Sequence, residues 1–171
     1  MEYGQESYSR HYIITALFKL MGDYEYGDIS VTDIVKKAGV GRATFYRYFK
    51  SKEDIIVYYF DSVAKEYASG QHYYPRCKDD YIQIVFDIMD KFCKHKEQLK
   101  LIRKARLEYL YLEYLNINFE KLFDRSYPNL NNYTPYLYAG MLFNISMQWL
   151  DNDCVEDAYN LAEVIVNAIY N

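Results

Sequence analysis

The sequence predicts an all-α protein of about nine helices, with an N-terminal three-helix helix-turn-helix head and a helical C-terminal body. Apolar residues recur at helical spacing along most of the 171 residues, without the strict alternation typical of strands. Apolar residues make up 51% of the chain, enough for a sizeable core. We expect residues 1–68 to form the head with its linking helix, and residues 69–171 to form the body, which would serve ligand binding and dimerisation.

The first helix is predicted to run from about Ser7 to Gly22. Ile13, Leu17 and Leu20 keep the spacing of one helical face along this segment. We expect that face to pack across the helices that follow.

The stretch from Ser30 to Asp54 has the composition of a helix-turn-helix. Ser30 and Asp33 are spaced as a capping box, which begins a short helix. Gly39 follows the last apolar residue of that helix, where a left-handed backbone most often ends a helix. A three-residue turn beginning at Gly39 then leads into a second helix over residues 42–49.

The second of these helices is predicted to bury Phe45 and Phe49 on one side. Its other side carries a small residue, a hydroxyl and an arginine. Such side chains reach base edges, since arginine binds guanine and methyl groups contact thymine, and the flanking tyrosine hydroxyls can meet phosphates. The residues predicted to contact DNA are Val31, Thr32, Arg42, Ala43, Thr44, Tyr46, Arg47, Tyr48 and Lys52.

Positive charge gathers on the same stretch. Residues 31–52 contain six basic residues and one acidic residue, a net charge of +5, whereas the whole chain carries −4. A basic segment on an otherwise acidic protein suits local phosphate binding, because the acidic remainder limits non-specific attraction to DNA. A charge run alone is more often a solvated surface, and it is the adjacent turn pattern that favours DNA binding here.

At these residues the chain resembles the TetR family of transcriptional regulators. The matching string is SVTDIVKKAGVGRATFYRYFKSKEDI, with a looser match at residues 16–18. The resemblance implies a homodimer on a palindromic double-stranded DNA operator, with repression as the commoner mode and a small apolar or aromatic effector. It also implies that Lys52 contacts the DNA backbone. Gly41 departs from the family, which more often has a serine or another capping residue there.

The helix after the one over residues 42–49 is predicted to start near Lys52, with Ser51 as its cap, and to run toward Ala68. Glycine and proline in residues 69–78 break the helical pattern and predict the domain boundary. The body is then predicted to contain helices over 79–94, 107–123, 135–150 and 155–170, a short helix or turn over 99–105, and a loop over 127–134.

Two functional surfaces are predicted on the body. Apolar side chains with hydroxyl tips could line an effector cavity, although each is more often a core residue; these are Met89, Phe92, Tyr109, Tyr111 and Tyr114. The helix over 135–150 is apolar on two sides, so with the last helix it predicts a four-helix dimer interface, the alternative being a monomeric core. The predicted interface residues are Tyr136, Gly140, Phe143, Met147, Trp149, Leu161, Ile165 and Ile169.

Other function classes find little support in the sequence. The motifs GxGxxG, GxSxG and HExxH and a phosphate loop do not occur, so we expect no catalysis, cofactor or metal. Three distant cysteines indicate reduced thiols of a cytoplasmic protein. No apolar run reaches the length of a membrane span and no secretion signal is present, so no membrane partner is expected. The alternative to a ligand-released regulator is a helical protein-interaction module, or a regulator that acts through a partner protein without a ligand.

Overall fold

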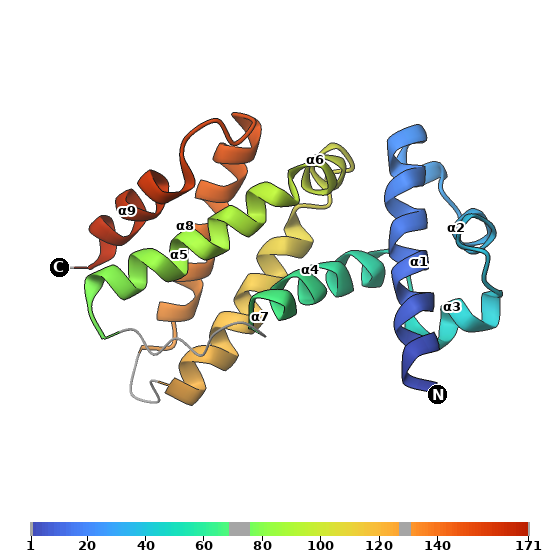
Figure 1. Ribbon diagram of the computed structural model, residues 1–171, viewed down its shortest axis with the longest axis horizontal. Coiled ribbons are helices and arrows are strands. Elements are labelled where there is room, and N and C mark those ends of the chain that lie inside the picture. The colour runs from blue at the N-terminus through green and yellow to red at the C-terminus, as the bar shows by residue number, and fades with distance from the viewer. Residues whose placement is uncertain (1, 69–75, 127–130, 171) are drawn as a thin grey trace.

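The computed structural model describes residues 2–68, 76–126 and 131–170. Their regular structure consists of nine α-helices and one short 3-10 helix, which confirms the all-α prediction (Figure 1). Residues 69–75 of the predicted boundary over 69–78, and residues 127–130 of the predicted loop over 127–134, lie outside the described residues. No helix within the described part is both long and apolar enough to cross a bilayer.

The head consists of three α-helices and the 3-10 helix, and a fourth α-helix links it to the body. These elements are α1 (Glu2–Asp23), η1 (Tyr26–Asp28), α2 (Val31–Ala38), α3 (Arg42–Tyr48) and the linking helix α4 (Lys52–Ala68). The body helices are α5 (Lys78–Lys94), α6 (Lys96–Lys104), α7 (Tyr109–Ser126), α8 (Thr134–Asp151) and α9 (Ala158–Ile169).

The buried face of α1 organises the head. Ile13 and Leu17 are fully buried, as are Ile34 of α2 and Phe45 of α3. These side chains belong to one apolar cluster. The predicted packing of the first helix across the helix-turn-helix is therefore observed, and it holds α2 and α3 at a fixed angle to each other.

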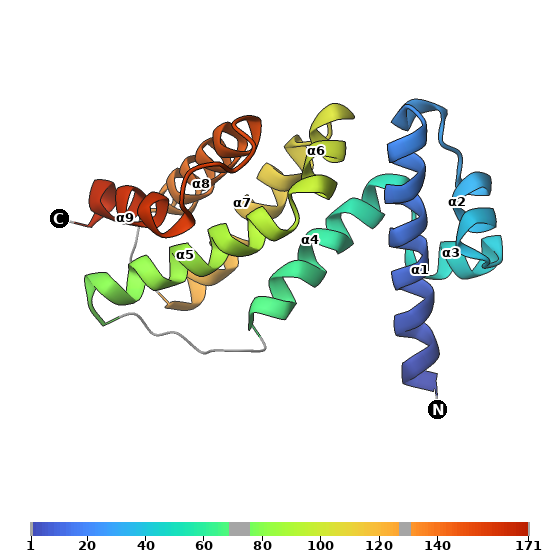
Figure 2. The same cartoon turned by 45° about the horizontal axis from the view of Figure 1, so that its top comes forward.

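The body is a bundle in which α5 packs along α9 and α7 packs along α8. Helix α4 leaves the head and contacts α5 and α7, so it joins the two parts of the molecule (Figure 2). Aromatic rings fill much of the interior: Tyr111 contacts Phe60 of α4, Phe92 of α5 and Phe143 of α8, with ring centroids 5.2, 5.9 and 6.2 Å away.

Several predicted boundaries shift in the structure. Helix α1 begins at Glu2 instead of Ser7, since residues 2–6 lack the apolar spacing on which the prediction rested. Helix α9 begins at Ala158, three residues later than predicted, because the Asp157 carboxylate caps it by accepting the N–H groups of Tyr159 and Asn160, each at 3.0 Å.

Candidate nucleic-acid interface

Helix α2 is held at both ends by local contacts. The Asp33 N–H donates to Ser30 Oγ at 3.2 Å, and the Ser30 N–H donates to the Asp33 carboxylate at 3.0 Å, which completes the predicted capping box. The Ser30 hydroxyl also donates to the Asp33 carboxylate, and this bond, followed by the one from the Ser30 N–H, holds the pKa of Asp33 below its usual range. Gly39 ends the helix with φ +68°, a left-handed conformation that favours glycine.

Helix α3 presents an apolar side to the head and a polar side to solvent. Phe45 is fully buried and Phe49 nearly so, with their ring centroids 6.0 Å apart. Arg42, Ala43 and Arg47 are exposed on the other side. As expected from its missing side chain, Gly41 provides no side-chain hydrogen bond at the start of this helix.

The cations of the helix-turn-helix differ from those of the body in their partners. Within the described residues, each of nine ion pairs takes its cation from elsewhere in the chain: Lys65, Arg76, Lys94, Lys96, Lys100, Arg103 or Lys104. The basic residues from 36 to 50 are exposed and take part in none of these pairs; they are Lys36, Lys37, Arg42, Arg47 and Lys50. Their charge is therefore available to an external anion such as a phosphate group.

A residue that the sequence did not single out organises this surface. The guanidinium carbon of Arg10, on α1, lies 4.7 Å from the ring centroid of Tyr48 and 5.5 Å from that of Tyr58. The guanidinium of Arg47 lies 5.9 Å from the same Tyr48 ring. Arg10 thus holds the Tyr48 ring at the end of α3. The two residues are 38 positions apart in the sequence, so no local spacing connects them.

The other predicted DNA-contacting residues differ in exposure. Thr32 and Tyr46 are exposed, whereas Thr44 is half-buried. The half-buried Val31 side chain packs against the head core. The exposed members of the predicted set therefore lie on the two helices of the helix-turn-helix, whereas Val31 helps to pack the core of the head.

The Lys52 side chain makes contacts inside the head. Its ammonium donates hydrogen bonds to the carbonyl oxygens of Tyr26 and Ile29, at 2.8 and 2.6 Å, and lies 4.2 Å from the ring centroid of Tyr26. It therefore holds η1 against the start of α4, and two of its three N–H groups are used inside the chain. The Tyr26 hydroxyl strengthens the same junction by donating to Glu53 at 2.7 Å, and burial followed by this bond raises the pKa of Tyr26 well above its usual range.

Replacing Lys52 by alanine should therefore lower the stability of the fold more than the affinity for DNA phosphates. The two carbonyl oxygens would lose a charged donor, and we expect the free energy of unfolding to fall by about 1.5–3 kcal/mol. Denaturant unfolding measures this loss, and DNA titrations at several salt concentrations should keep the slope of the unsubstituted protein. Unchanged stability with a slope reduced by about one would instead assign Lys52 to a phosphate contact.

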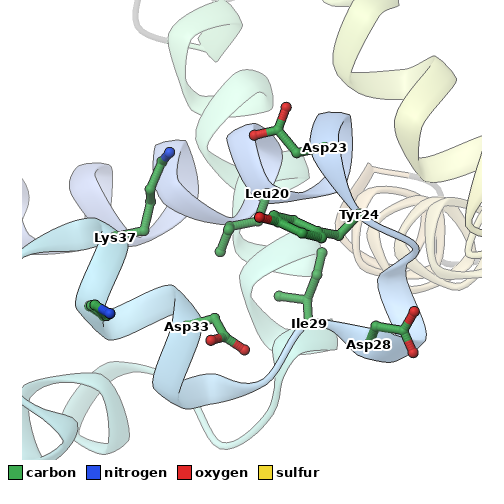
Figure 3. Close-up of a pocket in the computed structure, with 8 residues that line it drawn as sticks. Leu20, Asp23, Tyr24, Asp28, Ile29, Asp33 and Lys37 are labelled. Atoms are coloured by element: carbon green, nitrogen blue, oxygen red, sulfur yellow. The ribbon is translucent and has the colours of Figure 1, made fainter.

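A pocket of about 650 Å³ opens on the head between the end of α1, η1 and α2 (Figure 3). Leu20, Tyr24 and Ile29 form its apolar part. Three carboxylates and two lysines surround them: Asp23, Asp28, Asp33, Lys36 and Lys37. The carboxylates make it a poor phosphate site, and it includes none of the five residues predicted to line an effector cavity.

Those five predicted cavity residues do not form one lining. Met89, Phe92 and Tyr111 are buried and pack in the body core, and burial raises the pKa of the Tyr111 hydroxyl. Tyr114 is half-buried beside Phe60, with a pKa that burial raises to about 12. Tyr109 is 47% exposed. Four of the five residues therefore lie in or beside the packed core, and Tyr109 lies apart from them at the surface.

The predicted dimer residues also divide. Met147, Trp149 and Ile165 are buried within the single chain, and the Trp149 indole N–H donates to the Glu156 carbonyl at 3.1 Å. These three side chains therefore pack inside one chain, which leaves the rest of the predicted set to meet a second copy. Tyr136 and Ile169 are exposed, and the half-buried residues are Gly140, Phe143 and Leu161.

Comparison with known proteins supports the assignment of the head. Residues 13–59 match the family model described as bacterial regulatory proteins, tetR family. The HTH-type dhaKLM operon transcriptional activator DhaS of Lactococcus lactis is 29% identical over 122 residues, which cover 69% of this chain and 56% of the relative. The HTH-type transcriptional regulator EthR of Mycolicibacterium smegmatis is 38% identical over 58 residues, 34% of this chain and 27% of the relative.

The likeness extends over the body in fold alone. The solved structure of Lin0861 from Listeria innocua superposes with a TM-score of 0.79 at 18% identity, over 96% of this chain and 90% of that one. The chain spans 56% of the length of the lactococcal relative and 27% of the mycobacterial one. A match to regulators agrees with the prediction that the chain is not an enzyme.

Proposed function

Because the chain belongs to the TetR family of transcriptional regulators, we propose that it binds a palindromic DNA operator as a homodimer and represses transcription there. Two copies of α3 would enter successive major grooves. Arg47 would bind a guanine, Ala43 and Thr44 would contact thymine methyl groups, and the tyrosine hydroxyls would meet phosphates.

One observation carries this proposal: the exposed cations of residues 36–50 have no ion-pair partner among the described residues, whereas seven cations elsewhere are paired. Unpaired charges on one surface keep their full attraction for phosphates. An interaction module that binds acidic protein surfaces could use the same charges. The exposed base-reading side chains of α3 favour DNA.

The direct test is fluorescence anisotropy with the DNA upstream of the protein's own gene and a scrambled duplex of the same composition. We expect preferential binding of the upstream DNA by two subunits, weakened by added salt with a slope of about −0.9 for each phosphate contact. A selection from random duplexes covers a distant operator. Failure to enrich any sequence in that selection would overturn the proposal.

The dimer would form through the outward faces of α8 and α9. Leu137 and Val164 are 70% and 65% exposed, although both are large apolar residues on helices. Exposed apolar side chains of this kind are typical of surfaces that meet a second copy. We therefore place these two residues in the interface, in addition to Tyr136 and Ile169.

Charged substitutions test this interface. Leu137→Asp and Val164→Asp should each convert dimers to monomers in light scattering, because a buried unpaired carboxylate is costly. Operator affinity should fall with dimerisation. Ile117→Asp, at a 49% exposed position on α7, is the matched control and should leave the dimer intact. Dimers that persist in both variants would place the interface elsewhere.

We propose repression, not activation, as the effect of the bound dimer on transcription. A dimer that covers a promoter excludes polymerase without any further contact, which makes repression the simplest outcome. The lactococcal relative is named as an activator. A reporter placed behind the selected operator should rise on deletion of the gene; a fall would instead establish activation.

A small apolar or aromatic effector that releases the DNA would have to enter the body among Met89, Phe92, Tyr111 and Tyr114. These side chains already lie in the packed interior, where the rings of Phe92 and Tyr111 are 5.9 Å apart. A drug-sized ligand needs about 300 Å³ or more, so these rings would have to separate. To release DNA, an effector must also bind the state with separated rings more tightly than the packed state. A regulator that acts through a partner protein without a ligand needs no such opening.

A further inference from the structure

Two cysteines that are distant in the sequence come together in the body. Cys93 lies in the last turn of α5, and Cys154 lies in the turn between α8 and α9; both are free thiols and half-buried. Both pack against the same apolar cluster. The third cysteine, Cys77, is exposed at the other end of α5, so it is not part of this pair.

Ion pairs hold the turn against the helix junction next to Cys93. The Asp153 carboxylate accepts hydrogen bonds from Lys96 and Lys100 of α6, at 3.2 and 2.6 Å. Lys96 is three residues after Cys93, and Asp153 immediately precedes Cys154. These contacts therefore fix the two cysteine-bearing segments next to each other.

The backbone of the turn is strained at the cysteine itself. Asp153 and Cys154 have φ values of +61° and +54°, in the left-handed region that residues with a Cβ rarely adopt. The Cys154 N–H closes the turn by donating to the Trp149 carbonyl at 2.9 Å. Backbone strain at a defined position is a reason to look for a function there.

The ionisation of Cys154 agrees with this proximity. Burial, the charge of Cys93 and a side-chain hydrogen bond with Cys93 together raise the pKa of Cys154 to about 12. The ionisation of Cys154 therefore depends on Cys93.

We propose that Cys93 and Cys154 form an intramolecular disulfide when the protein meets a hydroperoxide, tying the end of α5 to the turn between α8 and α9. The Cys93 thiolate attacks the terminal oxygen of the hydroperoxide, the O–O bond breaks, and an alcohol leaves after taking up a proton. The Cys154 sulfur then attacks the resulting sulfenic acid, an S–S bond forms, and water leaves with the Cys154 proton. Two thiols and one hydroperoxide thus give one disulfide, one alcohol and one water.

The bond would lie beside the contact between the body and the linking helix. His95 is two residues after Cys93, and its Nδ1 lies 2.7 Å from the Tyr59 hydroxyl of α4. Oxidation would therefore constrain the junction on which α4 rests. Formation of the disulfide does not depend on DNA binding, so its test is independent of the proposed function.

The test uses the full chain carrying Cys77→Ser, which removes the exposed thiol. After treatment with tert-butyl hydroperoxide, we expect a monomeric product lighter by two hydrogen masses, a proteolytic peptide pair joined through Cys93 and Cys154, and reversal by dithiothreitol. Adding Cys93→Ser or Cys154→Ser should abolish the mass change, and circular dichroism checks that each variant is folded. Sulfinic or sulfonic products at either cysteine without the joined peptides, unreacted thiols, or a disulfide between two chains would each overturn the proposal.

Discussion

Replacement of Phe45 by alanine is expected to lower the free energy of unfolding by about 3–5 kcal/mol. The Phe45 side chain is fully buried and contacts the ring of Phe49. Alanine would leave a cavity in the cluster that joins α3 to α1 and α2, and the short helix α3 has few other anchors. Denaturant unfolding followed by circular dichroism measures the loss.

Two further variants make this result specific. Phe45→Leu keeps most of the apolar volume and should lose clearly less than Phe45→Ala. Tyr12→Ala removes an aromatic ring that is 54% exposed on α1 and should change stability by about 0.5 kcal/mol or less. Equal losses for Phe45→Ala and Tyr12→Ala would show that Phe45 does not anchor the head.

Replacement of Arg47 by alanine should weaken operator binding by about 1–3 kcal/mol, which is roughly 5- to 150-fold in Kd. The side chain is exposed and has no ion-pair partner among the described residues, so folding should be unaffected. Loss of a bidentate contact to guanine removes base discrimination, so the cost should vary with the base at one operator position. Anisotropy titrations with operators substituted position by position measure this.

The controls separate base reading from charge. Arg47→Lys keeps the charge but loses the planar fork, so it should recover little of the discrimination. Lys121→Ala removes one positive charge on α7, away from the head, and should leave operator affinity nearly unchanged. A loss of the same size on operator and scrambled DNA would assign Arg47 to phosphate binding.

Local interactions explain which predictions the structure confirms. The capping box of Ser30 and Asp33, the left-handed Gly39 and the burial of Phe45 all follow from contacts within a few residues or from one helical face. The Ser51 hydroxyl likewise accepts the Asp54 N–H at 3.2 Å, as predicted for the start of α4. Such features are encoded in short stretches of sequence.

Helical spacing was less informative in the body. Two large apolar residues of α7, Ile117 and Leu122, are 49% and 53% exposed. On α8, Met147 and Trp149 are both buried, although they are two residues apart and so lie on different sides of the helix. Spacing gives the angle of a side chain around its helix, but it does not tell which sides of the helix a neighbour covers.

The sequence by itself determined the all-α class, the helix-turn-helix and its caps, and the positive charge of the candidate interface. Only the tertiary structure decided that the Lys52 ammonium binds the carbonyls of Tyr26 and Ile29, that Arg10 stacks on Tyr48, and that Asp153, next to Cys154, binds Lys96 near Cys93. The physical reason is separation along the chain. Helices and caps depend on residues within about four positions of one another, whereas these contacts join residues 23 or more positions apart, which come together only when the whole core packs.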